Sequence, residues 1–185
     1  MHPSERCLSK TRLEEEMTVT AVTDVELASI SVSKVTDAVY LDQAVEEVFG
    51  LMLGVPVELV DEEFLTDDAA ETMTAMIGLA GAISGTCAML VKAEAGVHMA
   101  GCMAGIELNG VDETVLDGLG EITNMLAGAW KAKIPELNVA CMLSVPTVVT
   151  GTQYVVHRKA PAFLVERSYR LGEHFFTVRV YGVIH

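Results

Sequence analysis

The amino-acid sequence predicts an α+β fold in which two long helices pack on an antiparallel β-sheet. Residues 112–135 carry the start, stop and apolar periodicity of a long helix, and residues 173–183 alternate apolar and polar side chains as a half-buried strand does. A second helical segment, which begins near residue 37, matches the first when it is shifted by 74 positions. Helices and groups of strands in this order favour long helices that cover one antiparallel sheet.

The helix at 112–135 has clear boundaries. Asp112 can cap the free backbone amides, Glu113 suits the first turn, and Pro135 is expected to stop propagation. Apolar residues recur at spacings of three and four and form one stripe that needs a core: Val115, Leu119, Ile122, Leu126 and Ala129. We therefore expect this stripe to face inward.

The opposite side of the same helix is polar. Asp117, Glu121, Asn124 and Gly128 share it, so that the Glu121 carboxylate and the Asn124 amide lie one turn apart. Three glycines also fall in this helix, although each costs roughly 0.5–1 kcal/mol relative to alanine: Gly118, Gly120 and Gly128. Close approach of another surface would explain them.

The shift of 74 positions indicates an internal duplication. It places Glu47 on Glu121 and Gly50 on Asn124, so only the second copy retains both polar groups. We expect residues 1–35 to form a mobile tail or loosely docked arm. Residues 36–185 would then be one domain made of two pseudo-repeats. Their expected bounds are about 36–106 and 107–185.

Strands are expected to follow each long helix, and a short helix, Ala93–Met103, separates the copies and ends near Gly105. The expected strands are 57–60, 73–80 and 84–92 in the first copy, and 138–149, 151–158, 162–170 and 173–183 in the second. The uncharged segment Thr72–Val91 is long enough to span a membrane. Its mild hydropathy and its central glycines favour two strands with a turn instead.

Charge and cysteine usage narrow the classes of function. The formal net charge is −14, and residues 35–130 hold seventeen acids and one base, Lys92. Nucleic acid is therefore an improbable ligand, and a partner with a basic rim suits the surface better. The cysteines and histidines show no metal-ligand spacing, and no secretory signal is evident, so reduced thiols in a cytoplasmic protein are expected.

Two segments in the second copy together resemble a known family. Residues 120–128 read GEITNMLAG and residues 144–151 read SVPTVVTG. This combination resembles the chemotaxis phosphatases CheX, CheC and FliY, whose mark is a helix with Glu, two residues, Asn and then a small-residue Gly segment. A single complete motif is similar to CheX-like chains, and the resemblance covers roughly residues 37–185. It implies a CheC/CheX-like version of the duplicated α+β fold.

The resemblance also implies an activity, namely hydrolysis of the aspartyl phosphate on a CheY-like receiver domain. Asn124 would orient the attacking water and Glu121 would pair with a receiver lysine; these are the expected catalytic residues. The residues expected to contact the partner are Asp117, Gly120, Ala127 and Gly128. No cofactor of the chain's own is implied, because the Mg²⁺ would belong to the receiver. A homodimer is implied as well.

Three alternatives remain open at this point. A CheX-like binding module could dock a receiver domain or another signalling partner without accelerating hydrolysis. A membrane-tethered adaptor is a weaker third reading of the uncharged segment. Without the family, an outward Glu and Asn would be read as solvated surface.

Overall fold

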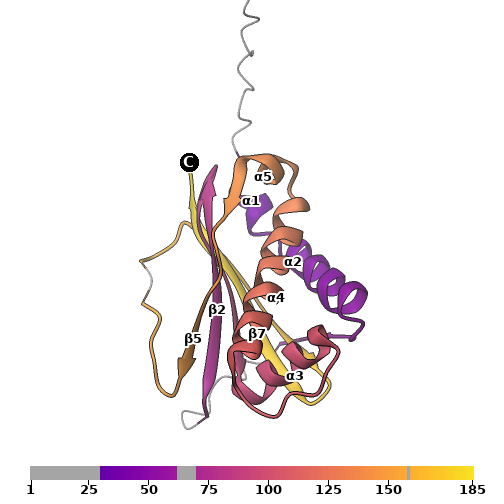
Figure 1. Ribbon diagram of the computed structural model, residues 1–185. Helices are drawn as coiled ribbons and strands as arrows, with labels where there is room; N and C mark the ends of the chain where they lie inside the picture. The colour runs from indigo at the N-terminus through magenta and orange to yellow at the C-terminus, as the bar shows by residue number, and fades with distance from the viewer. Residues whose placement is uncertain (1–29, 62–69, 158) are drawn as a thin grey trace, which may run out of the picture.

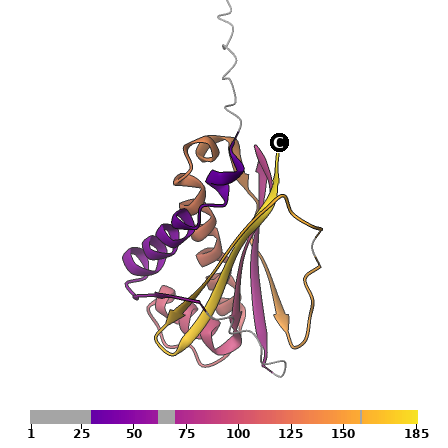
Figure 2. The same cartoon turned by 180° about the vertical axis from the view of Figure 1, so that it is seen from behind.

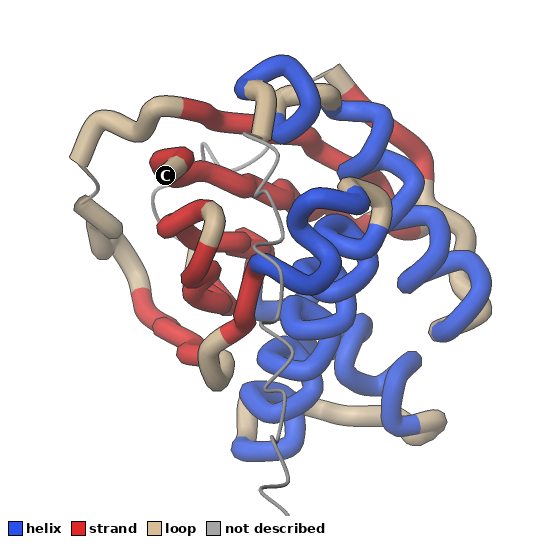
Figure 3. Tube along the Cα trace, turned by 90° about the horizontal axis from the view of Figure 1, so that it is seen from above, coloured by secondary structure: helices blue, strands red, loops and turns tan. Residues whose placement is uncertain are grey.

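The computed structural model describes residues 30–61, 70–157 and 159–185. They form two layers, with helices against one face of a sheet (Figure 3). The helices are α1 (Val32–Val35), α2 (Ala38–Val45), the π-helix η1 (Glu46–Met52), α3 (Ala93–Ala104), α4 (Glu113–Ala132) and α5 (Pro135–Ala140). The strands are β1 (Glu58–Val60), β2 (Thr72–Gly81), β3 (Ile83–Lys92), β4 (Cys141–Leu143), β5 (Thr147–Gly151), β6 (Phe163–Leu171) and β7 (His174–Ile184).

The described strands form one antiparallel sheet in the order β1-β6-β7-β3-β2-β4, with β5 also paired to β2. Strands β2, β3 and β7 form its centre, and α4 lies across one face of it (Figure 1). The connection from β5 to β6 lies on the opposite side of the sheet, as the view from behind shows (Figure 2), and its Tyr154 hydroxyl forms a hydrogen bond of 2.7 Å with the Thr74 hydroxyl of β2. The core lies between helices and sheet, where Trp130, Phe49 and Phe176 are fully buried.

The strand order suits two copies of one unit. The order reads the same from either edge when β1, β2 and β3 are exchanged with β4, β6 and β7. The first strand of each group thus pairs with the second strand of the other group. Two units related by a pseudo-twofold axis would produce this order, and the duplication itself stays a prediction.

Several predicted elements match closely. Asp112 precedes α4, α3 ends at Gly105 in the left-handed conformation (φ 66°), and β2, β3, β6 and β7 lie within one residue of their expected bounds. The uncharged segment Thr72–Val91 is a β-hairpin, as its glycines predicted. Among the helices of the described residues, none combines the length and apolar character needed to cross a membrane.

Two of the expected strands were wrong, and two helical segments carry features that were not predicted. Helix α4 ends at Ala132, before Pro135 as predicted, and Pro135 also occupies the first turn of α5, where its missing N–H costs nothing. The expected strand 138–149 is therefore helical at its start and interrupted between β4 and β5, and residues 152–156 are not a strand. The first long helix changes to a π-helix at Glu46.

The predicted N-terminal arm falls mostly outside the described residues, since the structure describes the chain from residue 30 onward. From there it packs on the domain: Val35 is fully buried and Ile30 is 8% exposed. The Lys34 ammonium also forms an ion pair with the Glu136 carboxylate of α5. These last residues of the expected arm therefore belong to the folded domain.

Candidate functional site on helix α4

Helix α4 is held in a defined rotation about its axis. The Asp112 carboxylate accepts a hydrogen bond from the Val115 amide at 3.0 Å, which satisfies one of the free donors of the first turn. The inward stripe is buried as expected, with four residues at 0% exposure: Val115, Leu119, Ile122 and Leu126. Ala129 is half-buried at its margin. Because the stripe cannot leave the core, the opposite face of the helix must point outward.

The predicted polar pair lies on that outward face. Glu121 is exposed, Asn124 is half-buried, and the Asn124 Nδ2 donates a hydrogen bond to the Glu121 carboxylate at 3.4 Å. An ionised carboxylate can only accept, so the amide must turn its NH₂ group toward Glu121. The Asn124 Oδ1 is then the atom that can accept a hydrogen bond from a water or a ligand.

Glu121 is the last of three carboxylates that form a row along the outward face of α4. Glu113, Asp117 and Glu121 are exposed and follow one another at four-residue spacing. Like charges at this spacing destabilise a helix by about 0.2–0.5 kcal/mol per pair, so the row adds nothing to folding. The lysines at the end of α4 do not neutralise it. The Lys131 Nζ donates to two backbone carbonyls, at 2.7 and 2.8 Å, and Lys133 is paired with Glu47.

Two residues that were expected to contact a partner lie inward instead. Gly120 and Ala127 are both buried, because they flank the apolar stripe on the side that faces the sheet. A Cβ atom at Gly120 would lie 3.2 Å from the Pro146 side chain. The expectation for these two residues was therefore wrong: they permit close packing within the chain rather than contact with a partner.

The other two residues do face outward. Asp117 is exposed, and a Cβ atom added at Gly128 would meet no atom within 4 Å. Gly118, by contrast, is required by packing, since a Cβ there would lie 2.9 Å from the Ala100 Cβ of α3. Packing within the chain thus explains Gly118 and Gly120, whereas nothing in the fold requires glycine at position 128.

The connection between β4 and β5 adjoins the site, which sequence reasoning missed. Pro146 packs on Gly120, and Val148 is the next nearest side chain. In the sequence, residues 144–151 carry part of the family resemblance and give no sign that they lie beside the polar pair. Their place beside the Glu–Asn helix depends on pairing with β2, which no local pattern reveals.

The corresponding residues of the first helix do not form a second site. Glu47 and Gly50 lie in η1, and the Glu47 carboxylate forms an ion pair with the Lys133 ammonium. Its side chain is about one-third exposed, and glycine at position 50 supplies no amide side chain. This pair braces the two long helices against each other.

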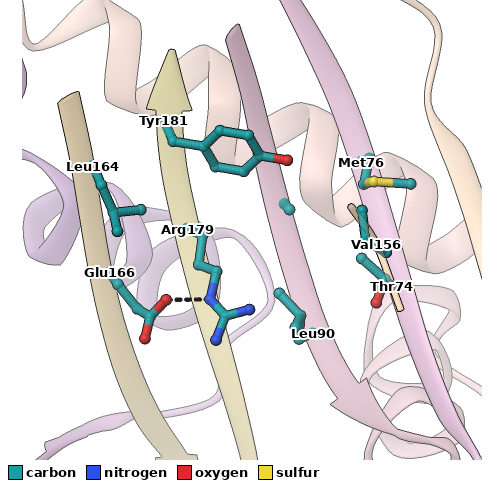
Figure 4. Close-up of a pocket in the computed structure, with 9 residues that line it drawn as sticks. Thr74, Met76, Leu90, Val156, Leu164, Glu166, Arg179 and Tyr181 are labelled. Atoms are coloured by element: carbon teal, nitrogen blue, oxygen red, sulfur yellow. Dashed lines mark hydrogen bonds and ion pairs between the residues drawn. The ribbon is translucent and has the colours of Figure 1, made fainter. Parts of the chain in front are cut away.

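A pocket of about 300 Å³ opens on the other face of the sheet (Figure 4). Its strand residues, such as Met76 and Arg179, alternate with the core residues Ile77 and Val178. The Glu166 and Arg179 side chains point toward each other there and form an ion pair. The pocket thus has its central charges matched within the chain and is separated from the Glu–Asn pair by the sheet.

Metal-binding groups do not gather in the described part of the chain, where one cysteine, Cys102, lies beside a histidine of the same helix, with its Sγ 3.7 Å from the His98 Nε2. Residues 30–61, 70–157 and 159–185 contain no cluster of three His, Cys, Asp or Glu side chains suited to a metal ion. Cys87 is fully buried, and burial raises the pKa of its thiol to about 12, which makes it unreactive at neutral pH. Cys7 lies outside the described residues. The outward face of α4 is therefore the best candidate site.

Known proteins resemble this chain in sequence and in fold. The sequence profile of the family "Chemotaxis phosphatase CheX" matches residues 73–166, which is just over half of the chain and includes α4 and the β4–β5 connection. A curated relative, the CheY-P phosphatase CheX of Thermotoga maritima, is 32% identical over 81 residues. That match covers 43% of this chain and 52% of the relative, so the chain spans about half the length of the curated relative.

Solved structures show the same fold. The chemotaxis protein CheX of Vibrio vulnificus superposes with a TM-score of 0.68 at 19% identity, over 83% of this chain and 99% of that one. CheX in a CheX–CheY–BeF3–Mg²⁺ complex from Borrelia burgdorferi gives a TM-score of 0.65 at 16% identity, over 80% and 99%. The predicted CheC/CheX-like α+β fold is thereby confirmed. Since the family's profile matches more than half of its residues, the chain belongs to the chemotaxis phosphatase CheX family.

Proposed function

We propose that this chain accelerates hydrolysis of the aspartyl phosphate on a CheY-like receiver domain. The curated relative is named for that activity, and the Borrelia structure contains a CheX with CheY, BeF3 and Mg²⁺. The observation that carries the proposal is the Glu121–Asn124 pair, which an otherwise well-packed helix presents outward on an acidic face.

The proposed chemistry needs positioning more than acid–base catalysis. An aspartyl phosphate is already activated, and the receiver's own Mg²⁺ would neutralise the developing charge. The Asn124 Oδ1 would accept a hydrogen bond from a water and place it in line with the phosphorus atom. The water oxygen bonds to phosphorus as the bond to the aspartate oxygen breaks, which releases phosphate and restores the carboxylate.

Glu121 has a separate role in this proposal. Its carboxylate holds the Asn124 amide in the free chain, and it would pair with a receiver lysine in the complex. The rest of the acidic row, including the exposed Asp117, would attract a basic rim on the receiver. The chain would need no metal of its own, act in the cytoplasm where such receivers work, and form a homodimer; these points rest on the resemblance and stay predictions.

The test follows the decay of a phosphorylated CheY-type receiver from the same organism, with and without this protein. We expect faster decay with the wild-type chain and a loss of about 100-fold in the catalysed rate for Asn124→Ala, because one preorganised group is removed. Asn138→Ala, the same change at an exposed position of α5, serves as control and should keep the wild-type rate.

Two results would contradict the phosphatase. Decay that is unchanged by saturating wild-type protein would exclude catalysis, and stable binding of the receiver in that experiment would identify the non-catalytic docking module instead. Full activity of Asn124→Ala would show that the chemistry lies elsewhere.

A further inference from the structure

The edge strand beside the site contains one extra residue. Leu143 pairs with Leu79 and Thr147 pairs with Met76, so the edge has three residues where β2 has two. Such a mismatch is a β-bulge, and bulges often redirect a side chain next to a functional site. Proline is tolerated here because a bulge on an edge strand leaves the missing N–H without consequence. The bulge consists of residues 144–146.

The backbone of the bulge is held on two sides. On the sheet side, the Ser144 amide donates to the Gly78 carbonyl at 2.9 Å, and the Ser144 Oγ accepts from the Gly78 amide at 2.9 Å. The Ser144 hydroxyl also donates to the Val145 carbonyl at 2.8 Å. On the helix side, Pro146 packs on Gly120, the residue before Glu121. The bulge is thus fixed against the turn of α4 that carries the polar pair.

Val145 is the one bulge residue whose side chain takes part in none of these contacts. It is 81% exposed, although its neighbours on both sides anchor the backbone. A single exposed valine is ordinary on a protein surface. Here the combination matters: an apolar side chain on an anchored backbone, one residue from a proline that touches α4. Protein interfaces commonly combine an apolar core with a polar rim, so an apolar side chain beside charged and polar groups suits such a surface.

We propose that Val145 is a docking contact that sets affinity for the receiver domain without taking part in the chemistry. Its partner would be an apolar patch on the receiver that borders the phosphorylated aspartate, since α4 and the bulge meet at Gly120. This inference rests on the proposed function, because it places the receiver over the Glu121–Asn124 face.

The experiment measures receiver dephosphorylation as a function of the concentration of the full chain. For Val145→Asp we expect the half-saturating concentration to rise about tenfold, since burial of a valine is lost and a carboxylate is introduced, while the rate at saturation stays at the wild-type value. Val145→Ala should give a smaller rise in the same direction. Val155→Asp is the matched control, because Val155 is 89% exposed on the β5–β6 connection, and it should behave as wild type.

The outcomes separate this inference from the proposed function. A half-saturating concentration for Val145→Asp equal to that of Val155→Asp would overturn the inference and leave the phosphatase intact. If the wild-type chain binds the receiver without accelerating decay, the phosphatase fails, and a binding titration of the same variants still decides the role of Val145. If the wild-type chain neither binds nor accelerates, both are overturned.

Discussion

The amide of Asn124 is a weak base, so its usefulness depends on where its oxygen points. The carboxylate of Glu121 decides this, because it can only accept a hydrogen bond and therefore attracts the NH₂ group. Spacing along the sequence predicted that the two side chains share one face of a helix. The family resemblance also placed Gly120 and Ala127 with the partner contacts, although both are buried, because the inward side of α4 is wider than the stripe of large apolar residues.

Replacement of Glu121 by glutamine should weaken receiver binding while the free chain stays as stable as wild type. Glu121 is exposed, so folding does not depend on it, whereas loss of a charge pair that becomes buried in the complex costs about 2–5 kcal/mol. Titration of the receiver measures the affinity, and urea unfolding measures the stability. Glu107→Gln, at an exposed residue outside α4, is the control; equal affinities for the two variants would refute the charge pair.

Helix α4 is defined at both ends by signals that a sequence can carry, but its surroundings decide what its glycines do. Gly118 lies under Ala100 of α3, Gly120 lies under Pro146, and Gly128 faces open space. Propensity alone treats the three alike. Local propensity likewise does not predict that Pro135, which follows the end of one helix, begins another. It also does not predict the change from α-helix to π-helix at Glu46.

Alanine substitutions at two of these glycines should have opposite effects on stability. Gly118→Ala should lower the free energy of unfolding by about 1–3 kcal/mol, because the new methyl group overlaps Ala100 and forces α3 away. Gly128→Ala should raise it by about 0.5–1 kcal/mol, because the helix gains propensity without a clash. Urea unfolding of both variants measures these changes, and a loss of stability for Gly128→Ala would contradict the open space beside Gly128.

Two ionisable side chains of the core, Cys87 and Tyr169, are buried in their neutral form. Burial raises the pKa of Cys87 to about 12 from its ordinary 9.0. Burial, and then the hydrogen bond that the Tyr169 hydroxyl donates to Asp42 at 2.7 Å, raise the pKa of Tyr169. The unfolded chain therefore releases these protons at a lower pH than the folded chain does.

The stability that these groups contribute is complete at neutral pH and should fall as pH rises above about 9 for Cys87 and above about 10 for Tyr169. Each group lowers the free energy of unfolding by up to about 1.4 kcal/mol per pH unit in that range. Urea unfolding at neutral pH and at about pH 10 measures the slope. Cys87→Ala should be less stable at neutral pH, because it leaves a small cavity, and should show a shallower alkaline slope. An unchanged slope would argue against a buried thiol.

The sequence by itself determined the class of fold, the bounds and rotation of α4, and the polar pair on its outward face. These features follow from short-range physics: capping, the helical period and strand alternation act between residues that are near in sequence. Only the tertiary structure decided the strand order, the bulge beside α4 and the burial of Gly120 and Ala127. Those features arise where distant segments meet, because a sheet edge and a helix packing distance depend on both partners at once, and no local pattern carries that information.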